Sequence, residues 1–432
     1  MKKFFFIILS SIFLFSNVCA ETFSAALKKA YKNNSELNAE RENIIISEQE
    51  LKISMSSYLP TITLEGSKSQ ESTDKLTNRD GSNATIVDAD TKTRSVSISQ
   101  TIFDFGRGAD LSKSKIGINL AKAKLLKKEQ DILYKTVEAY TGLISANEKL
   151  EINRANVELL NRQVETDRIR LERGQITLSD ISQSESSLAG AEASFIQAQN
   201  DLLTSKLNYE NIIGSLNNAQ SLDKNSIVNY PIPQSLDSAL ELSKKSNPDL
   251  IMSEMEYEQS QKDTSIARSE LVPTAKLSLE KSYSDDLSST IDEREKETLK
   301  ATVTWPFYSG GKNLASLNKN KSLENRSRLT LDSQVKQNQT NVASAWSNYQ
   351  SNKSLLNSVQ LQVKAAEIAN EGITAEYNSG SSGRTTFEVI QSNSLLLNAQ
   401  ISLADSERNY ILSEFNLLKS IGLLNSDYLK LR

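Results

Sequence analysis

The stretch TIFDFGRG, residues 101–108, joins a run of alternating polar and apolar residues to a long segment with helical periodicity. The preceding residues 95–100 read SVSISQ, and this alternation is typical of a β-strand with one apolar face. A second stretch, TWPFYSGG at residues 304–311, again lies between a strand-like run and a long helical pattern. The chain makes the same transition twice, which predicts an internal repeat.

The repeat extends over nearly the whole chain. ALKKAYKNNSEL at 26–37 is similar to ALELSKKSNPDL at 239–250, and LNYENIIG at 207–214 is similar to FNLLKSIG at 415–422. A self-similarity of this length is a signature of duplicated structural units. The predicted organisation is listed in chain order: a first repeat over 21–214, a polar linker over 215–235, a second repeat over 236–422, and a C-terminal tail over 423–432.

Each repeat has the same predicted layout. A helix ends before a proline, because the residue that precedes a proline is excluded from helical geometry; a β-hairpin, a very long helix and a shorter helix follow. The predicted ranges are 24–58, 60–103, 104–172 and 180–213 in the first repeat, and 235–271, 273–307, 312–378 and 388–421 in the second. The long helices carry apolar residues at seven-residue spacing, as in Leu143, Leu150 and Val157, which favours lengthwise coiled-coil packing.

The four predicted strands are too few to close a barrel within one chain. Their apolar faces also have no second sheet in the chain to pack against. Strands contributed by several copies of the chain would form one closed wall without edges. The sequence therefore favours an oligomer.

Composition excludes several classes of protein. The 432 residues include no His and one Cys, which excludes His-based acid–base catalysis and Cys/His zinc sites. Lys and Arg number 50 against 54 Asp and Glu, without a basic cluster, which argues against a nucleic-acid partner. We expect no metal and no cofactor. The scattered Ser and acidic residues form no nucleophile-elbow or phosphate-loop motif, so an enzyme is the weakest hypothesis.

Residues 1–20, MKKFFFIILSSIFLFSNVCA, are typical of a secretory signal peptide, with two lysines, an apolar core and a small residue at Ala20. Cleavage after Ala20 would remove the one cysteine, Cys19; a lipid anchor on Cys19 is the alternative. Beyond residue 20, no apolar run approaches the ~20 residues that a membrane-spanning helix needs. A role in a membrane would therefore use strands.

These residues resemble the TolC-like outer-membrane efflux proteins. The resemblance rests on the junctions IFDFGR (102–107) and PFYSGG (306–311), the helix-ending Leu59-Pro60 and Val272-Pro273, and the paired L/F-N-x4-I-G ends. It implies a mainly α-helical fold with a β-barrel part: a homotrimer whose twelve strands form a barrel in the outer membrane of a Gram-negative bacterium, continued into the periplasm by stacked helices.

The resemblance also implies a function and partners. The trimer would be a passive exit duct in contact with outer-membrane lipid, without catalysis. It would work with a periplasmic adaptor protein and an inner-membrane pump, either ABC-type or proton-driven, in tripartite efflux or type I secretion. The alternative is a secreted structural coiled-coil protein, which predicts no conductance and leaves the alternating hairpins without a role.

Two sets of residues are predicted in the barrel region, the first from the resemblance and the second from the alternation of the strands. The barrel–helix junctions would be Pro60, Phe103, Gly106, Pro273, Phe307 and Gly310. The two glycines would permit a sharp change of direction, although an ordinary tight turn explains them equally well. From the alternation itself, we expect Leu277, Leu279, Val303 and Trp305 to contact lipid, and Ser278, Thr302 and Thr304 to face the lumen.

The resemblance places a gate at the periplasmic turns. It implies that Glu388 is the tip acid and that Gln391 stands where the family has a second acid. It also implies that Arg384 pairs with Asp180 across neighbouring helix pairs to restrain the tip, with Tyr377 in the same polar network. Gly174 and Gly380 would lie where the adaptor docks. An alternative needs no gate: Thr385-x-x-Glu388 and the looser Thr177-x-x-Asp180 are capping-box patterns, in which each acid supports a helix N-terminus.

Overall fold

The computed structural model describes most of the chain. The described residues are 21–72, 74, 75, 77–83, 89–216, 222–228, 230–288, 291–379 and 383–431. The predicted signal peptide over 1–20 and the predicted docking residue Gly380 lie outside the described residues, as do residues 217–221 and 229 of the predicted linker.

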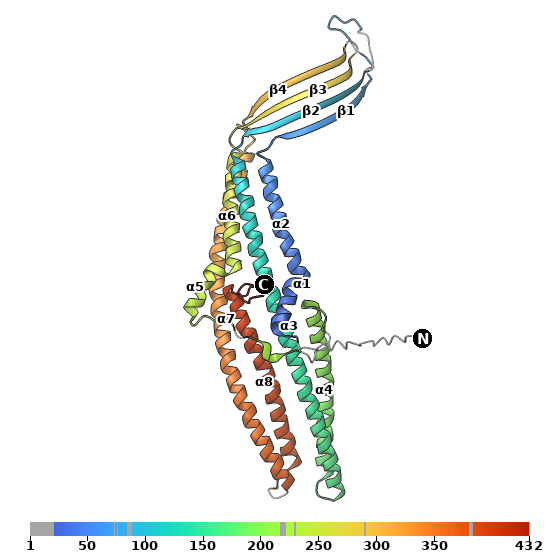
Figure 1. Cartoon of the computed structure of the whole chain (residues 1–432), viewed down its shortest axis with the longest axis vertical. Coiled ribbons are helices and arrows are strands. Elements are labelled where there is room, and N and C mark those ends of the chain that lie inside the picture. Colours follow the sequence, from blue (N-terminus) through green and yellow to red (C-terminus); the bar gives the residue numbers. More distant parts are fainter. Residues whose placement is uncertain are drawn as a thin grey trace, which may run out of the picture. The chain divides into compact units, whose positions relative to one another are not determined.

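The elements occur twice in the same order (Figure 1). The first set is α1 Phe23–Asn33, α2 Ser35–Ser56, β1 Thr61–Glu71, β2 Ala89–Phe103, α3 Gly106–Glu172 and α4 Leu178–Ile212. After the short 3-10 helix η2, Lys224–Ser226, the second set is α5 Leu236–Ser246, α6 Pro248–Ser269, β3 Thr274–Ser288, β4 Ile291–Thr304, α7 Lys312–Ser379 and α8 Thr386–Ile421. The long helices α3 and α7 contain 67 and 68 residues.

The chain forms two compact units. Of the described residues, the sheet unit contains those within Ala39–Lys127 and Pro248–Asn338. The core unit contains those up to Asn38, those within Lys128–Asn247 and those from Gln339 onward. Each unit takes segments from both predicted repeats, so compact packing does not follow the repeat boundary. No described helix combines the length and apolar character that crossing a membrane requires.

The predicted single helices over 24–58 and 235–271 are wrong, because each is broken at an asparagine. Asn34 and Asn247 both have extended backbone geometry, with ψ of 123° and 119°. The Asn34 Oδ1 caps α2 by accepting from the backbone N–H of Glu36 at 3.0 Å, and Pro248 opens α6 after the second break. The carboxamide N–H groups of Asn34 and Asn247 donate to the carbonyl oxygens of Ile212 and Ser420. The first break is therefore bonded to the C-terminal end of α4 and the second to the C-terminal end of α8.

The sheet is antiparallel throughout, with the order β1-β2-β3-β4. Its register aligns Ile62, Ile98, Leu279 and Leu299 in one row across the four strands. Along β2 from 91 to 99 the polar odd-numbered residues are half-buried and the even-numbered ones are exposed, so the sheet curves with its polar face concave. A hollow of about 420 Å³ on that concave face is lined by Ser278, Thr302 and Thr304 among others.

The two residue sets that alternation separates lie on opposite faces of the sheet. Leu277, Leu279 and Val303 are on the convex face, and Ser278 pairs with Lys300 on the concave face. Trp305 follows β4 directly and donates its indole N–H to the carbonyl oxygen of Leu271 at 3.2 Å. Their assignment to lipid and lumen remains a prediction.

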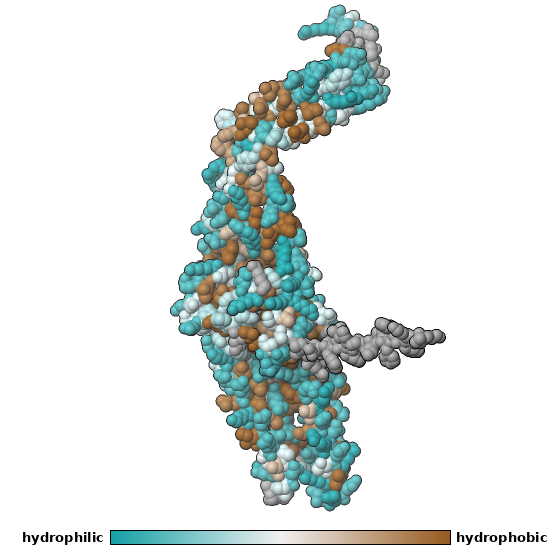
Figure 2. Space-filling view, in the orientation of Figure 1, coloured by the Kyte–Doolittle hydropathy of each residue, from teal (hydrophilic) through white to brown (hydrophobic). Residues whose placement is uncertain are grey.

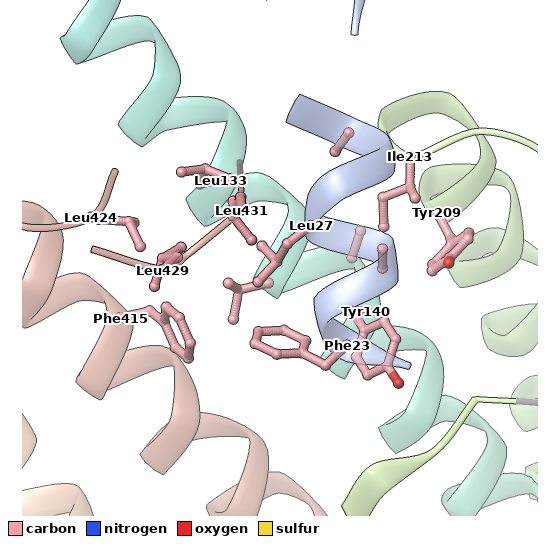
Figure 3. Close-up of a cluster of buried hydrophobic side chains, with 14 of the residues drawn as sticks. Phe23, Leu27, Leu133, Tyr140, Tyr209, Ile213, Phe415, Leu424, Leu429 and Leu431 are labelled. Carbon is pink, nitrogen blue, oxygen red and sulfur yellow. The ribbon is translucent and has the colours of Figure 1, made fainter. Parts of the chain in front are cut away.

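The hydrophobic core lies in the core unit, where α1, α3, α4 and α8 meet (Figure 3). Phe23 packs edge-to-face on both Tyr140 and Phe415, with ring centroids 5.2 and 5.5 Å apart. The Tyr140 hydroxyl lies within hydrogen-bonding distance of the carbonyl oxygens of Glu21 and Asp223. Burial raises the pKa of the Tyr140 phenol, so it remains protonated at neutral pH.

The segment 423–431, predicted as a tail, is part of this core. Leu424, Leu429 and Leu431 are buried among the aromatic side chains (Figure 3). The backbone N–H of Ser426 donates to the buried carboxylate of Glu129, and the Tyr428 hydroxyl donates to the carbonyl oxygen of Pro231. Nothing in the local sequence pattern distinguishes this segment from an exposed tail, because its partners lie on α1, α3 and the linker.

Gly422, which ends α8, is expected to tolerate no side chain. It has a φ of 91°, and a Cβ there would overlap the backbone of Ser246 and Asn247. A non-glycine residue in this region costs about 1–3 kcal/mol before any overlap is counted. We expect Gly422→Ala to lower the free energy of unfolding by about 3 kcal/mol or more, adding the overpacking cost, as measured by urea unfolding in detergent.

The matched control for Gly422→Ala is Gly372→Ala. Gly372 lies inside α7 and a Cβ there would meet no atom within 4 Å. Because alanine favours a helix interior over glycine by about 1 kcal/mol, this variant should be unchanged or stabilised. Equal unfolding midpoints for the two variants would contradict the close approach at Gly422.

Candidate functional site

Both predicted capping boxes are confirmed, one at the turn that joins α3 to α4 and one at the turn that joins α7 to α8. Thr177 and Asp180 exchange hydrogen bonds at the start of α4: the Thr177 N–H donates to the Asp180 carboxylate at 2.9 Å and the Asp180 N–H donates to the Thr177 hydroxyl at 3.3 Å. Thr385 and Glu388 do the same at the start of α8, with the same two distances. These bonds lower the pKa of both carboxyl groups, so both acids are charged at neutral pH.

Arg384 is bound by acids of its own turn. Its Nε donates to Glu376 at 2.7 Å and its Nη1 donates to Glu388 at 3.0 Å. Hydrogen bonds to these two carboxylates raise the pKa of the guanidinium. Within this chain, the acid that holds Arg384 is therefore not Asp180, whose carboxylate bonds go to Thr177.

A buried carboxylate that the sequence analysis missed connects the two helix turns. Asp167 on α3 is fully buried, and its oxygens accept from Gln163 at 3.0 Å, from the Ser184 hydroxyl at 2.6 Å and from the Tyr377 hydroxyl at 3.2 Å. Ser184 lies on α4 and Tyr377 on α7. A buried charge is costly unless hydrogen bonds surround it. These three donors supply that stabilisation from three helices.

The Tyr377 side chain extends this Asp167 network to the fourth helix. Its hydroxyl lies 2.8 Å from that of Thr386 on α8, and the Arg170 guanidinium lies 4.3 Å above its ring. Tyr377 was predicted as part of a tip network, and the structure places it against Asp167. The signal that could have identified Asp167 is its heptad position, three residues after Val164, where the stripe expects an apolar residue.

The remaining predicted tip residues are less connected. Gln391 lies one turn after Glu388 on α8 with an exposed side chain. Gly174 sits in the α3–α4 turn with a φ of 69°, in open surroundings. Its positive φ is a turn requirement that glycine meets without strain.

The two junction glycines differ in their physical roles. Gly106 opens α3 at ordinary φ, and a Cβ there would lie 2.5 Å from the Ser269 hydroxyl, so a larger residue would have to displace that side chain of α6. Gly310 instead has a φ of 63° in open space, where a turn requires it. The positive φ of Gly310 fits both predicted roles, a change of direction and a tight turn, whereas Gly106 has no such backbone requirement.

Aromatic residues gather at both junctions. Phe103 packs edge-to-face on Phe105, and Trp305 on Phe307, with ring centroids 4.4 and 5.5 Å apart. Phe307 and the adjacent Tyr308 are almost fully exposed. Pro60 and Pro273 immediately precede β1 and β3, in the places predicted for strand entry.

No group of three or more metal-ligating side chains is arranged around a common point in the described part of the chain. The polar chemistry of the turns consists of hydrogen bonds and ion pairs between side chains and helix termini. This arrangement can hold helix ends together and present charge.

Comparison with known proteins places the chain in a family. The profile described as "Outer membrane efflux protein" matches residues 26–215 and 239–423. The chain is 26% identical to the outer membrane efflux protein BepC of Brucella suis biovar 1 (strain 1330), over 96% of this chain and 88% of BepC. It is 23% identical to the proteases secretion protein PrtF of Dickeya chrysanthemi, over 93% and 88% of the two chains.

Solved structures show the same fold. A crystal structure of CusC matches with a TM-score of 0.80 at 15% identity, over 93% of this chain and 92% of CusC. The Campylobacter jejuni CmeC outer membrane channel matches with a TM-score of 0.79 at 16% identity, over 93% and 85%. Because the profile covers both halves of the sequence and the fold agrees, this chain belongs to the outer membrane efflux protein family.

Proposed function

We propose that three copies of this chain form a passive exit duct through the outer membrane, working with a periplasmic adaptor and an inner-membrane pump. Family membership supports a channel rather than an enzyme. PrtF and the alkaline protease secretion protein AprF of Pseudomonas aeruginosa are named for secretion, whereas BepC and CmeC are named for efflux or a channel. The duct is common to both systems, and the pump would supply the energy.

The observation that carries this proposal is the pair of free edges on the sheet. Among the strands that the structure describes, β1 and β4 each have one edge without a neighbouring strand. On the convex face, Ile62 and Leu64 of β1 are 65% and 78% exposed, and Leu299 and Val303 of β4 are 70% and 72% exposed. The central-strand residues Ile98 and Leu279 are each 38% exposed on the same face.

Membrane-spanning strands must have their backbone groups paired, so free edges cannot remain in a bilayer. The extra exposure of the edge residues is the area that a neighbouring strand would cover. With four strands from each chain, three copies supply twelve strands, enough to close a barrel. The concave polar face, with Ser278, Thr302 and Thr304, would then line the lumen.

We propose that the Asp167 network restrains the periplasmic gate. It joins α3 and α4 to α7 and α8 beside the turns, so the two helix pairs cannot separate without breaking hydrogen bonds to a buried carboxylate. Glu388 would present negative charge at the tip and favour cations, and Arg384 would moderate that charge because it binds both Glu388 and Glu376. Gln391, which has an amide where the family has an acid, would weaken this preference for cations. The adaptor would dock at the turns that carry Gly174 and Gly380.

Single-channel conductance in a planar bilayer tests both the duct and its gate. Tyr377→Phe removes one of the three donors to Asp167, a loss of about 1–3 kcal/mol from the closed tip. We expect small cation-biased steps from the wild-type trimer and several-fold larger steps from Tyr377→Phe. Tyr308→Phe, the same chemical change at an exposed junction residue, should behave as wild type.

A second variant tests the charge of the tip in the same conductance recordings. The double variant Arg384→Ala with Glu388→Ala should lose much of the cation bias. If the Tyr377→Phe trimer gives conductance steps of wild-type size, the Asp167 network does not restrain the gate, although the proposed duct stands. A folded trimer that never conducts would refute the duct and leave the alternative of a secreted coiled-coil protein.

A further inference from the structure

We propose that the convex face of the sheet binds the phosphate groups of an anionic outer-leaflet lipid, through Arg94 and Lys92 at the end of the apolar band. This inference rests on the proposed barrel. The argument uses the register of the strands, the ion pairs on this face and the direction in which the strands run.

The convex face changes from apolar to charged within two rows. The register gives the rows in order from the helix end: Ile62, Ile98, Leu279, Leu299; then Leu64, Val96, Lys281, Glu297; then Gly66, Arg94, Tyr283, Glu295; then Lys68, Lys92, Asp285, Glu293. Successive rows are about 7 Å apart, two residues along a strand. Figure 2 shows this change as brown on the sheet nearest the helices and teal toward the loops.

Two of the four cations in these rows have acidic partners and two do not. Lys68 pairs with Asp90 at 2.9 Å, and Lys281 pairs with Glu295 at 2.6 Å. Among the ion pairs of the described residues, neither Arg94 nor Lys92 has an acidic partner, and both side chains are exposed. Their positive charge is therefore available to an external anion.

The surroundings of Arg94 leave room for such an anion. Its neighbour on β1 is Gly66, which has no atom within 4 Å of its Cβ position, and its neighbour on β3 is the exposed phenol of Tyr283. A guanidinium binds phosphate oxygens in a bidentate, charge-assisted geometry. Arg94 can donate these two hydrogen bonds, and Lys92 lies one row beyond it as a second positive charge.

The acidic residues of the same face confine the site. Glu293, Glu295 and Glu297 lie on the convex face of β4, and they would repel a phosphate from that strand. On β3, Asp285 lies directly across from Lys92 and Lys281 is paired with Glu295, so the unpaired cationic part of the face is limited to Arg94 and Lys92 on β2. Immediately below it lie Val96 and Ile98, which would contact the acyl chains of the same lipid.

The direction of the strands assigns the leaflet. In the sheet unit, α2, α3, α6 and α7 connect to the end of the sheet that carries Thr61 and Thr304, and the charged rows lie toward the opposite end. Members of this family extend into the periplasm on their helical side, so the charged rows face the outer leaflet. Lipids of that leaflet in Gram-negative bacteria are acylated glycolipids that carry phosphate, which fits a basic cluster beside an apolar band.

The test is native mass spectrometry of the detergent-purified trimer with bis-phosphorylated lipid A as the probe. Lys92→Gln with Arg94→Gln should weaken lipid A retention by about tenfold or more, because charge-assisted contacts to phosphate are lost. The matched control is Lys276→Gln with Lys300→Gln, which removes the same charge from the concave face and should retain lipid A as wild type does.

Three results would overturn the site: equal lipid A retention in both double variants, equal binding of lipid A stripped of its phosphates, or inorganic phosphate alone displacing the lipid at equal concentration. The first result would show that Arg94 and Lys92 do not bind the lipid. The second would show that the phosphate groups are not recognised, and the third that the acyl chains contribute nothing. Assembly is read from the same spectra. A wild-type sample without trimers would refute the proposed duct itself, which is a different failure from a trimer that ignores lipid A.

Discussion

Deletion of residues 423–432 should abolish folding of the core unit. The deletion removes Leu424, Leu429 and Leu431 from contact with the core around Phe23 and Phe415. Burial of one leucine side chain contributes about 1.5–3 kcal/mol, so the three together contribute about 5–9 kcal/mol. This is comparable to the whole stability of a typical domain, about 5–15 kcal/mol.

The deletion also leaves a buried acid without its partner. The carboxylate of Glu129 on α3 accepts a hydrogen bond from the backbone N–H of Ser426. A buried carboxylate that loses its partner is destabilising in its own right. The measurement is the yield of folded trimer by size-exclusion chromatography and circular dichroism. Lys430→Ala changes an exposed residue of the same segment and should give wild-type yield. Wild-type yield from the deletion would show that the segment is dispensable.

Arginine at Leu279 should block assembly in the outer membrane, whereas arginine at Ser278 should be tolerated. Leu279 is in the apolar row of the convex face, and Ser278 faces the concave hollow. Arginine on the lipid face of a barrel costs about 2–4 kcal/mol near the bilayer midplane, and the proposed trimer would carry the substitution three times. On the lumen side, the guanidinium remains in water.

The measurement for this pair is the amount of trimer in isolated outer membranes, resolved by electrophoresis without heating. Because the two substitutions are adjacent and introduce the same charged side chain, they compare the two faces of the sheet directly. Equal trimer yield from both would refute the assignment of the faces. Loss of trimer from Ser278→Arg alone would reverse it.

Local patterns in the sequence determined much of this molecule. The alternation in β2 and β3 separated the two faces of the sheet, because neighbouring residues of a strand point in opposite directions. Thr177-x-x-Asp180 and Thr385-x-x-Glu388 predicted the two capping boxes, because a box is complete within four residues. The prolines at 60 and 273 likewise marked the starts of β1 and β3.

Other features depended on contacts that no local pattern contains. The breaks at Asn34 and Asn247 interrupt helices that periodicity predicts as continuous, and each is tied to a residue more than 170 positions away. Arg384 is a local case instead: within this chain it binds Glu376 and Glu388 of its own turn, and its pairing with Asp180 across neighbouring helix pairs stays a prediction.

The sequence by itself determined the strands, the caps and the order of elements, because each depends on residues within a few positions of one another. Only the tertiary structure decided that Asp167 is a buried junction of four helices and that the last residues belong to the core. Asp167 meets Tyr377 across 210 positions, and Ser426 meets Glu129 across 297. Such pairs are brought together by the packing of long helices, and burial, which gives them their energy, exists only once that packing is complete.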